Sequence, residues 1–366
     1  MTKQLGLGTI LAHAGIKSDK ATGALAAPLH FSTTYQHPEF GQSTGFDYTR
    51  TKNPTRAALE KTLAAIEYAD FALATSSGMS AVVLVFETFP IGSKVVAARD
   101  LYGGSFRWFD EQEKNGRFFF TYAQTEEDLL AAITDDTDIV YLETPTNPLM
   151  IEFDIEKIAQ LAHKKGAKVL VDNTFYSPVY QNPLLLGADA VIHSATKYLS
   201  GHNDVLAGAV MTNDQDLYDK FFYNHNTTGP TLSPFDSYLL MRGLKTLKLR
   251  MEKATENAQK IAAFLKHSPA VKEVYYTGKG GMVSFKVCHP TKIPAIINHL
   301  ELITFAESLG GVESLITYPA TQTHKDIPAA DRESYGLTDD LLRLSIGIED
   351  AADLIEDLQS ALEVED

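Results

Sequence analysis

The sequence predicts an α/β fold with a mostly parallel sheet, joined to a smaller α+β C-terminal domain and an extended N-terminal arm. Three observations support this. Residues 1–54 contain many breakers, residues 55–235 alternate short β-rich runs with helical patterns, and residues 236–366 combine a long helical pattern with alternating strands. With 366 residues, 44% of them hydrophobic, the chain has material for a sizeable core, and general disorder is excluded.

The first part, residues 1–54, is predicted to be an arm rather than a domain. Runs such as PLHFSTTYQHPEFGQSTG have little apolar periodicity and many turn-forming residues, so this segment cannot close a core of its own. Arms of this kind pack on another body. We therefore expect it to contact its own domain or a neighbouring subunit.

The second part, residues 55–235, is predicted to be the ligand-binding domain. A helix is expected from Pro54 onward, because proline is tolerated in a first helical turn and the apolar residues after it have helical spacing. Alternating strands and helices indicate parallel strands with helices on both faces. The expected strands are residues 71–76, 94–98, 138–143, 167–172 and 189–194, and a further helix is expected at 155–165.

The third part, residues 236–366, is predicted to be the smaller domain. A continuous helical pattern from about Pro234 to Leu265 indicates a long connecting helix. Residues 273–277 and 281–287 alternate as strands of a half-exposed sheet do, and residues 350–362 form an amphipathic pattern.

Charge and cysteine content exclude several classes of partner. Asp and Glu number 47 against 32 Lys and Arg, and the net charge of −15 disfavours nucleic acid and membrane surfaces as partners. Cys288 is the only cysteine, so no internal disulfide can form, and a reducing compartment is expected. Because the sequence shows neither a secretory signal nor a long apolar run, we expect a cytoplasmic protein.

Polar residues gather where predicted strands end, which is the edge at which parallel α/β sheets bind ligands. Taken singly, each has an ordinary explanation: an Asp caps the next turn, a Gly makes a turn, and a Lys is solvated. The combination is more informative, because an acid, hydroxyls next to a lysine and a small-residue anion cradle are all expected on one rim. These residues are Gly78, Met79, Asn147, Asp172, Ser194, Thr196 and Lys197.

This combination suits a pyridine aldehyde that carries a phosphate. Lys197 can form a Schiff base, and Asp172 can keep the pyridine nitrogen protonated so that the ring accepts electrons. Gly78 and Met79 begin a helix, and their N–H groups lie at the end of a helix where a phosphate is favoured. The hydroxyls of Ser194 and Thr196 can donate further hydrogen bonds to the same phosphate. The sequence lacks a P-loop, a complete dinucleotide fingerprint, a zinc-ligand spacing and a G-x-S-x-G elbow, and we predict no metal site.

Nine motifs together resemble one family of enzymes. The chain is similar, nearly end to end, to the Cys/Met-metabolism family of pyridoxal-phosphate (PLP) enzymes, which includes cystathionine γ-synthase, cystathionine γ-lyase, cystathionine β-lyase and methionine γ-lyase. The resemblance implies the PLP-dependent aminotransferase-like fold (fold type I). The motifs are DYTRTKNPTR (47–56), SSGMSA (76–81), DLYGG (100–104), ETPTNP (143–148), VDNTF (171–175), HSATKYLSGH (193–202), RGLKTL (242–247), ESLGGVESL (307–315) and LLRLSIGIED (341–350).

The resemblance also implies roles for individual residues. Lys197 would bind the cofactor and then carry protons, Asp172 would pair with the ring nitrogen, and Tyr102 would stack on the ring. Arg343 would bind the substrate α-carboxylate in a bidentate manner. Gly78, Met79, Ser194 and Thr196 would bind the phosphate, and Tyr48 and Arg50 would reach it from the neighbouring subunit. Asn147 would contact the ring hydroxyl, and Asn147 and Ser308 would help to fix the substrate carboxylate.

The implied chemistry passes through an external aldimine to γ-elimination or γ-replacement. Lys197 would remove the α-proton, and Tyr102 is the candidate acid or base for the leaving group. Thiol uptake by the resulting intermediate is synthase chemistry, whereas its hydrolysis to a 2-oxo acid and ammonia is lyase chemistry. The family also implies a homotetramer made of two active dimers.

Acidic positions favour members that act at the γ-carbon. Asp47 and Glu307 fall where such members carry acids that bind a distal ammonium group, and Arg107 matches a residue placed for a distal carboxylate. Gly104 stands where methionine γ-lyase has cysteine, which disfavours that enzyme, and Thr51 stands where some synthases have a second arginine.

The sequence therefore predicts an enzyme acting on cystathionine, or on O-acylhomoserine with cysteine, as a cystathionine γ-lyase or γ-synthase. The choice between these two remains open. The alternatives are cystathionine β-lyase or cysteine desulfhydrase activity and, more remotely, a PLP aminotransferase.

Overall fold

The structure is a computed structural model that describes residues 5–364, and the structural statements below concern these residues. The chain divides into two compact units: Met1–Pro90 with Ser177–Lys248 (the first unit), and Ile91–Tyr176 with Leu249–Asp366 (the second unit). Each unit is described by itself. The domain boundaries predicted from the sequence, after residues 54 and 235, stay a prediction, because the two units group the chain in a different way.

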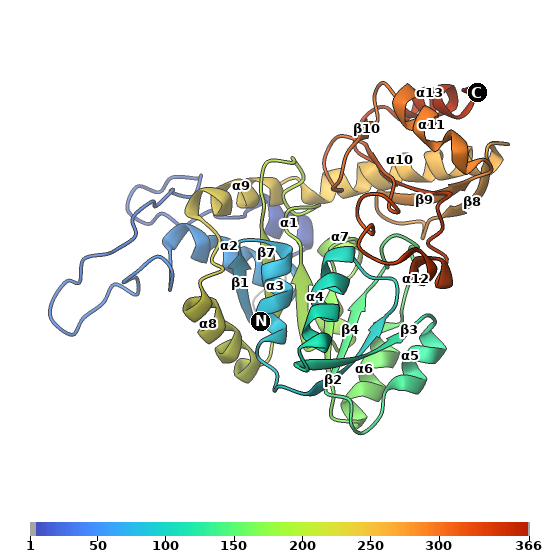
Figure 1. The fold of residues 1–366 in the computed structure, drawn as a ribbon. Helices are drawn as coiled ribbons and strands as arrows, with labels where there is room; N and C mark the ends of the chain where they lie inside the picture. The colour runs from blue at the N-terminus through green and yellow to red at the C-terminus, as the bar shows by residue number, and fades with distance from the viewer. Residues whose placement is uncertain (1–4, 365–366) are drawn as a thin grey trace. The chain divides into compact units, whose positions relative to one another are not determined.

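The N-terminal arm lies in the first unit. Between α1 (Leu7–Ala12) and α2 (Pro54–Ile66) the described chain forms no helix and no strand, as expected, and Figure 1 shows this segment as a long loop that projects away from α2. Its base is fixed to α2, because the Thr55 hydroxyl donates to the Pro28 carbonyl at 2.8 Å and accepts the His30 N–H at 3.0 Å. Large apolar side chains along the arm are exposed, namely Leu25, Phe31, Phe40 and Tyr48.

Helix α2 begins where the sequence predicts it. The buried Asn53 side chain accepts hydrogen bonds from the N–H groups of Thr55 and Arg56, and Pro54 occupies the first helical position. The other helices of the first unit are α3 (Gly78–Phe86), α7 (Ser177–Tyr180), the 3₁₀ turn η1 (Pro183–Leu186), α8 (Gln215–Thr228) and α9 (Pro234–Leu244).

The strands of the first unit are antiparallel, in the order β1, β7, β6. The strands β1 (Phe71–Thr75) and β6 (Ala190–His193) were predicted, whereas β7 (Gly208–Thr212) was not. Short apolar runs are ambiguous without their neighbours, which explains the omission. Because β7 runs antiparallel to β6, no crossover helix is needed, and the connection is free to form the turns that carry Ser194–Lys197.

The second unit contains the parallel strands in the order β5, β4, β2, β3. Residue pairs such as Val95 with Ile139 and Glu143 with Asp172 fix their register. The predicted α/β class with mostly parallel strands is confirmed, although β3 was not foreseen. The elements are β2 (Ser93–Ala98), α4 (Gly103–Lys114), β3 (Phe118–Ala123), α5 (Glu126–Ala132), β4 (Ile139–Glu143), α6 (Ile155–Lys164) and β5 (Lys168–Asp172).

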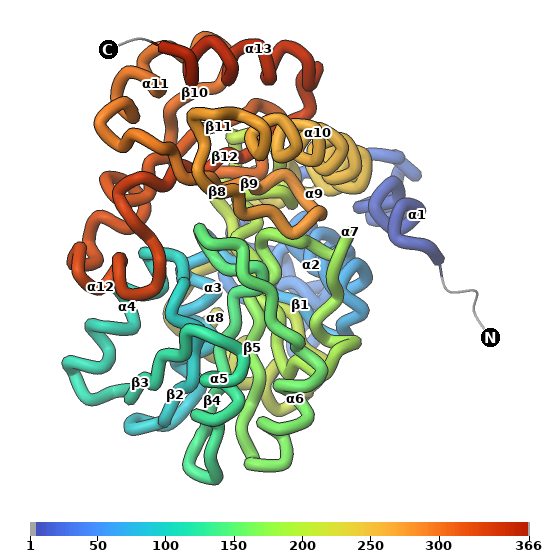
Figure 2. Tube along the Cα trace, turned by 90° about the vertical axis from the view of Figure 1, so that its right-hand side faces the viewer, coloured from blue at the N-terminus to red at the C-terminus, as the bar shows by residue number. Residues whose placement is uncertain are grey.

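The second unit also contains a smaller mixed sheet in the order β10, β11, β12, β9, β8. Figures 1 and 2 show α10, α11 and α13 gathered on one side of these strands, and their apolar side chains form one buried core with β9, β11 and β12. The elements are α10 (Leu247–His267), β8 (Val271–Tyr275), β9 (Met282–Val287), η2 (Pro290–Lys292), α11 (Ile293–His299), β10 (Thr304–Phe305), β11 (Leu315–Thr317), α12 (Ala329–Ser334), β12 (Leu341–Ser345) and α13 (Ala351–Leu362).

Two expectations for this part of the sequence were wrong. The long helix predicted from about 234 to 265 is two helices, α9 and α10, because Lys245 and Thr246 donate to carbonyls three residues back, which tightens the turn and ends α9. Strand β9 is not half exposed but almost wholly buried, since it lies inside the sheet between β12 and β8 and Ser284 on it donates to the Pro148 carbonyl.

A buried carboxylate connects α13 to the chain before β10. Asp357 accepts the N–H groups of Glu301, Leu302 and Ile303 at 2.8, 3.1 and 2.9 Å. We expect Asp357→Asn to lower the free energy of unfolding by about 1–3 kcal/mol, because an amide N–H₂ would face backbone donors. The matched control Glu356→Gln, at an exposed neighbour, should change it by less than about 0.5 kcal/mol. Equal denaturant midpoints for the two variants would contradict this expectation.

Candidate active site

The start of α3 offers an anion-binding helix end in the first unit. Ser77 and Ser80 form a reciprocal cap, in which the Ser77 hydroxyl accepts the Ser80 N–H at 3.0 Å and the Ser80 hydroxyl accepts the Ser77 N–H at 2.9 Å. Gly78 and Met79 are the first two helical residues, where N–H groups and the helix dipole favour a negative charge. The local structure thus suits the predicted phosphate role.

Close backbone approaches shape this helix start. A Cβ on Gly78 would lie 2.7 Å from the Cβ of Ser194 and 2.9 Å from its Oγ, so only glycine lets the two segments meet. Gly208 on β7 likewise lies against the Ser77 carbonyl, where a Cβ would come within 2.1 Å. The structure therefore brings together Gly78 and Ser194, two residues predicted to bind phosphate, and the cradle they make fits that group.

Thr196 and Lys197 lie in the turns after β6. The Thr196 hydroxyl donates to the Ala207 carbonyl at 3.1 Å and accepts the Ala207 N–H at 3.0 Å, so its proton is used within the loop. The N–H of Lys197 donates to the Ser194 carbonyl at 3.1 Å, which holds the half-buried lysine one turn after Ser194. The predicted roles of Thr196 and Lys197 stay predictions.

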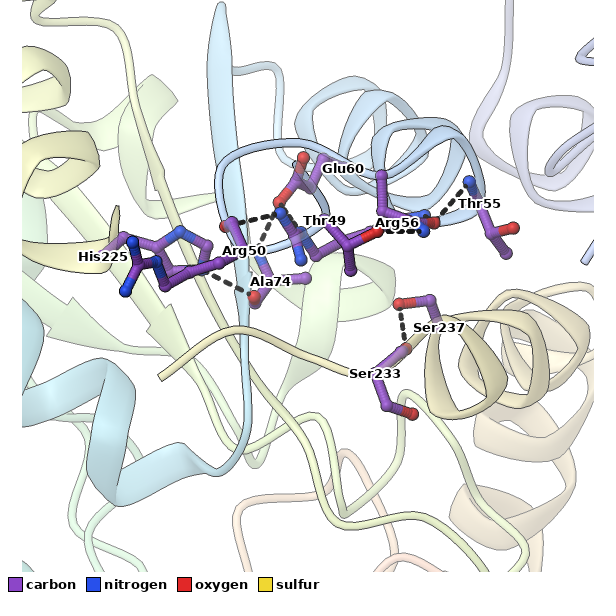
Figure 3. A network of polar contacts seen from close by, with 10 residues as sticks. Thr49, Arg50, Thr55, Arg56, Glu60, Ala74, His225, Ser233 and Ser237 are labelled. Atoms are coloured by element: carbon purple, nitrogen blue, oxygen red, sulfur yellow. Dashed lines mark hydrogen bonds and ion pairs between the residues drawn. The ribbon is translucent and has the colours of Figure 1, made fainter. Parts of the chain in front are cut away.

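Tyr48 and Arg50 lie on the arm with exposed side chains, and the Arg50 guanidinium lies 5.6 Å from the Tyr48 ring centroid. The main chain of Arg50 is fixed, because the buried Arg56 donates from Nη2 to its carbonyl at 3.0 Å (Figure 3). Arg56 Nε lies 3.4 Å from Glu60, and burial raises the pKa of that carboxyl to about 7. The arm thus presents two exposed side chains from an anchored backbone.

Asp47, predicted to bind a distal ammonium group, has partners on its own arm. It accepts the Ser43 hydroxyl, and His37 Nε2 lies 3.3 Å from its carboxylate. Its side chain is exposed, and its predicted substrate role stays a prediction.

Tyr102 immediately precedes α4 in the second unit, and two glycines decide its position. Its ring lies over Gly104, where a Cβ would come within 2.4 Å of the ring, and a Cβ on Gly103 would lie 2.0 Å from the Thr323 carbonyl. The N–H of Tyr102 donates to Glu143 at 2.8 Å. Burial, with Arg107 opposing it, raises the pKa of the phenol. At neutral pH the phenol is therefore a proton donor.

Arg343 and Asn147 meet directly within the second unit. Arg343, on β12, is 2% exposed and donates from Nη1 to Asn147 Oδ1 at 2.8 Å. Its Nη2 donates to the Ser308 carbonyl at 3.1 Å and the Thr317 hydroxyl at 3.2 Å. The guanidinium predicted to bind a carboxylate is thus held rigidly by three neutral oxygens, and Ser308 contributes its backbone carbonyl to this arrangement.

Asp172 ends β5 beside a second acid that sequence reasoning missed. Its Oδ1 accepts the N–H and the hydroxyl of Thr174, and its register partner on β4 is Glu143. Burial, together with the smaller effect of the Asp172 charge, raises the pKa of Glu143 to about 8, and burial raises that of Asp100 to about 7. Glu143 is therefore largely protonated near neutral pH, and Asp100 is about half protonated.

Arg107 and Glu307 are less enclosed. Arg107 Nη1 lies 2.7 Å from Asp326, and both side chains are about half exposed or more. Glu307 is exposed. Its negative charge raises the pKa of Tyr102, but by less than burial does and by less than Arg107 lowers it. A distal carboxylate of the substrate would compete with Asp326 for the Arg107 guanidinium. The sequence analysis did not predict this ion pair.

Several residues that shape this site escaped sequence reasoning. Asp100 and Glu143 belong to the motifs DLYGG and ETPTNP, so the strand-end argument used for Asp172 would have found Glu143. Buried His324 carried no signal, because it is a lone histidine whose bonding partners are far away in sequence.

The titration of Glu143 generates a stability prediction. Its folded pKa of about 8 exceeds the ordinary value of 4.5, so the stability it contributes is complete below about pH 4.5 and is lost as pH rises to 8. Relative to the wild type, Glu143→Gln should therefore gain stability from pH 5 to pH 8. The same gain in the free energy of unfolding for Asp100→Asn should level off near pH 7. Denaturant unfolding of each variant and of the wild type at each pH measures these differences. If the difference between Glu143→Gln and the wild type did not change with pH, the assignment would be wrong.

Two kinds of feature are absent from the described residues. No helix in residues 5–364 is both long and apolar enough to cross a bilayer. In the same range, no three His, Cys, Asp or Glu side chains gather in a way that would hold a metal ion.

Comparison with known proteins identifies the family. Residues 8–363 match the family described as Cys/Met metabolism PLP-dependent enzyme. Cystathionine γ-synthase of Haemophilus influenzae is 49% identical over 99% of both chains. The cystathionine γ-synthase/O-acetylhomoserine (thiol)-lyase of Bacillus subtilis is 51% identical over 97% of this chain and 95% of that protein.

A solved structure agrees with these relatives. Cystathionine γ-synthase from Xanthomonas oryzae pv. oryzae, in complex with aminoacrylate and cysteine, matches with a TM-score of 0.96 and 40% identity over 98% of both chains. The family predicted from the motifs is confirmed, and so is the PLP cofactor. The chain belongs to the Cys/Met-metabolism family of PLP-dependent enzymes.

Proposed function

We propose that this enzyme makes or breaks the γ-carbon–sulfur bond of cystathionine. Its substrates would be cystathionine, or an O-acylhomoserine together with cysteine, so that it acts as a cystathionine γ-lyase or γ-synthase. The observation that carries the proposal is the buried guanidinium of Arg343, which Asn147 and Thr317 hold in place and which is of the side-chain type that binds an amino-acid carboxylate in a bidentate manner. The two relatives named γ-synthase support the γ-carbon as the position of reaction.

Bound PLP supplies an electron-accepting ring that stabilises negative charge developing beside the substrate amine. On the protein side, Lys197 would hold the cofactor aldehyde and then move the α-proton at its Nζ, and Asp172 would keep the ring nitrogen protonated. Tyr102 would stack on the ring. Gly78, Met79, Ser194 and Thr196 would bind the phosphate, and a neighbouring subunit would contribute Tyr48 and Arg50 to it.

Six side chains are proposed to orient the substrate. Arg343 binds the α-carboxylate with help from Asn147 and Ser308, while Asp47 and Glu307 bind a distal ammonium group. Arg107 binds a distal carboxylate by exchanging its partner Asp326. The Tyr102 phenol delivers a proton to the leaving group, a role that its raised pKa supports.

The proposed assembly is a homotetramer of two active dimers in the cytoplasm. Exposed apolar side chains on the arm, such as Phe31 and Phe40, support contact with another subunit. The single cysteine, Cys288, is compatible with a reducing compartment.

A product assay tests the reaction. The purified PLP-loaded enzyme is offered cystathionine alone, and then O-acylhomoserine with cysteine. We expect either cysteine, 2-oxobutyrate and ammonia from the first, or cystathionine from the second. Homocysteine and pyruvate as the main products of cystathionine would instead establish the β-lyase alternative, and amino-group transfer with the carbon–sulfur bond intact would indicate an aminotransferase. Either result would overturn the proposal.

The lysine assignment has its own test. Borohydride reduction of the PLP-loaded protein should leave a pyridoxyl group on the peptide that contains Lys197, as detected by mass spectrometry. Lys197→Ala should abolish turnover and this adduct, because no other amine would hold the aldehyde, while the exposed control Lys164→Ala should keep both. An adduct on a different peptide of the wild type would refute the role of Lys197.

A further inference from the structure

A wholly buried histidine joins two backbone segments of the second unit. His324 Nε2 lies 3.1 Å from the Leu101 carbonyl and 3.1 Å from the Asn147 carbonyl. Its other ring nitrogen, Nδ1, lies 2.8 Å from the Thr323 hydroxyl. Leu101 and Asn147 are 223 and 177 residues away in the chain, so only folding brings these groups together.

The partners determine the tautomer of this ring. Both carbonyls can only accept, so Nε2 carries the proton and shares it between them. Nδ1 is then an acceptor for the Thr323 hydroxyl. Burial and the nearby charge of Arg343 lower the pKa of His324 to about 4, so the ring is neutral near pH 7. One neutral imidazole therefore satisfies all three contacts.

Both carbonyls belong to segments that carry candidate site residues. The Leu101 carbonyl and the Tyr102 N–H are the two ends of one peptide group, and this group is held by His324 at its oxygen and by Glu143 at its N–H. Asn147 is held by His324 at its backbone carbonyl and by Arg343 at its side chain. The imidazole thus links the backbones next to Tyr102 and Asn147 directly, and the Leu149 N–H, which donates to Asp100 at 2.9 Å, is a second link between the same segments.

The chain around His324 reinforces this link. The Thr323 carbonyl packs on Gly103 so closely that a Cβ there would lie 2.0 Å from the oxygen. Two residues after His324, Asp326 pairs with Arg107 at 2.7 Å. The segment Thr323–Asp326 therefore contacts the chain between Leu101 and Arg107 through a carbonyl, a ring and a carboxylate.

We propose that His324 is a positioning residue for the reaction, whose shared N–H helps to set the spacing between the Tyr102 phenol and the Asn147–Arg343 pair. This inference rests on the proposed roles of Tyr102, Asn147 and Arg343. A histidine that only stabilised the fold would affect unfolding without changing the backbone at residues 101–104 and 147–150 in the folded enzyme. The two possibilities therefore differ in a measurable way.

The test compares three variants in the PLP-loaded full-length protein. His324→Gln places an amide N–H₂ near the position of Nε2, whereas His324→Asn is one carbon shorter and its amide lies near Nδ1. The matched control is Asn257→Leu, because the buried Asn257 side chain also donates to two backbone carbonyls of the second unit, those of Gly347 and Glu349, at 3.1 and 2.7 Å.

The first measurement is amide hydrogen exchange, which needs no substrate and therefore stands even if the proposed function fails. We expect His324→Asn to speed exchange at residues 101–104 and 147–150 by about fivefold, the size expected from losing one neutral hydrogen bond. His324→Gln should restore protection at both segments. The control should lower the melting temperature without changing either segment.

The second measurement is steady-state kinetics on the substrate identified by the product assay. We expect His324→Asn to lower kcat/KM by about ten- to a hundredfold, since misplaced reacting groups have effects of this size, with most of this recovered in His324→Gln. The proposal is overturned if His324→Asn exchanges and turns over like the wild type, if glutamine is no better than asparagine, or if Asn257→Leu produces the same local change.

Discussion

Arg343 lies almost wholly buried in β12, and its guanidinium donates to Asn147, Ser308 and Thr317. A buried cation is costly unless hydrogen bonds surround it, and removing its partners costs several kcal/mol in typical proteins. The requirement to satisfy this charge fixes where β11, β12 and the Asn147 loop lie. It also leaves a cation in place to attract a substrate carboxylate, so one interaction serves both the fold and the proposed chemistry.

Close backbone approaches serve the same end in both units. Gly78 lets α3 start against Ser194, and Gly208 lets β7 pass the Ser77 carbonyl. Gly104 makes room for the Tyr102 ring, and Gly103 makes room for the chain before His324. At each point a side chain would push apart segments that carry candidate site residues. The absence of a Cβ thus decides the shape of each part of the site.

Burial shifts the pKa of three titratable groups of the second unit toward the neutral form. Burial raises the pKa of Asp100 to about 7 and that of Glu143 to about 8, and it lowers that of His324 to about 4. Glu143 and His324 hold the backbone through hydrogen bonds while remaining mostly uncharged at pH 7. They therefore add little charge beside Arg343 and Asp172, in an interior where electrostatic interactions are stronger than in water.

The sequence by itself determined the family, the α/β class and the residue types at the strand ends, because motifs and periodicity are local properties that the chain carries without its fold. It placed the start of α2 and both ends of β1, β4, β5 and β6 to within a residue or two. Tertiary structure alone decided that β7 is antiparallel, that β9 is buried, and that the helical pattern after 234 breaks at Lys245. It alone brought His324 to Leu101 and Asn147 and withdrew Glu143 from water. These outcomes depend on groups distant in sequence, and on burial that no local pattern records.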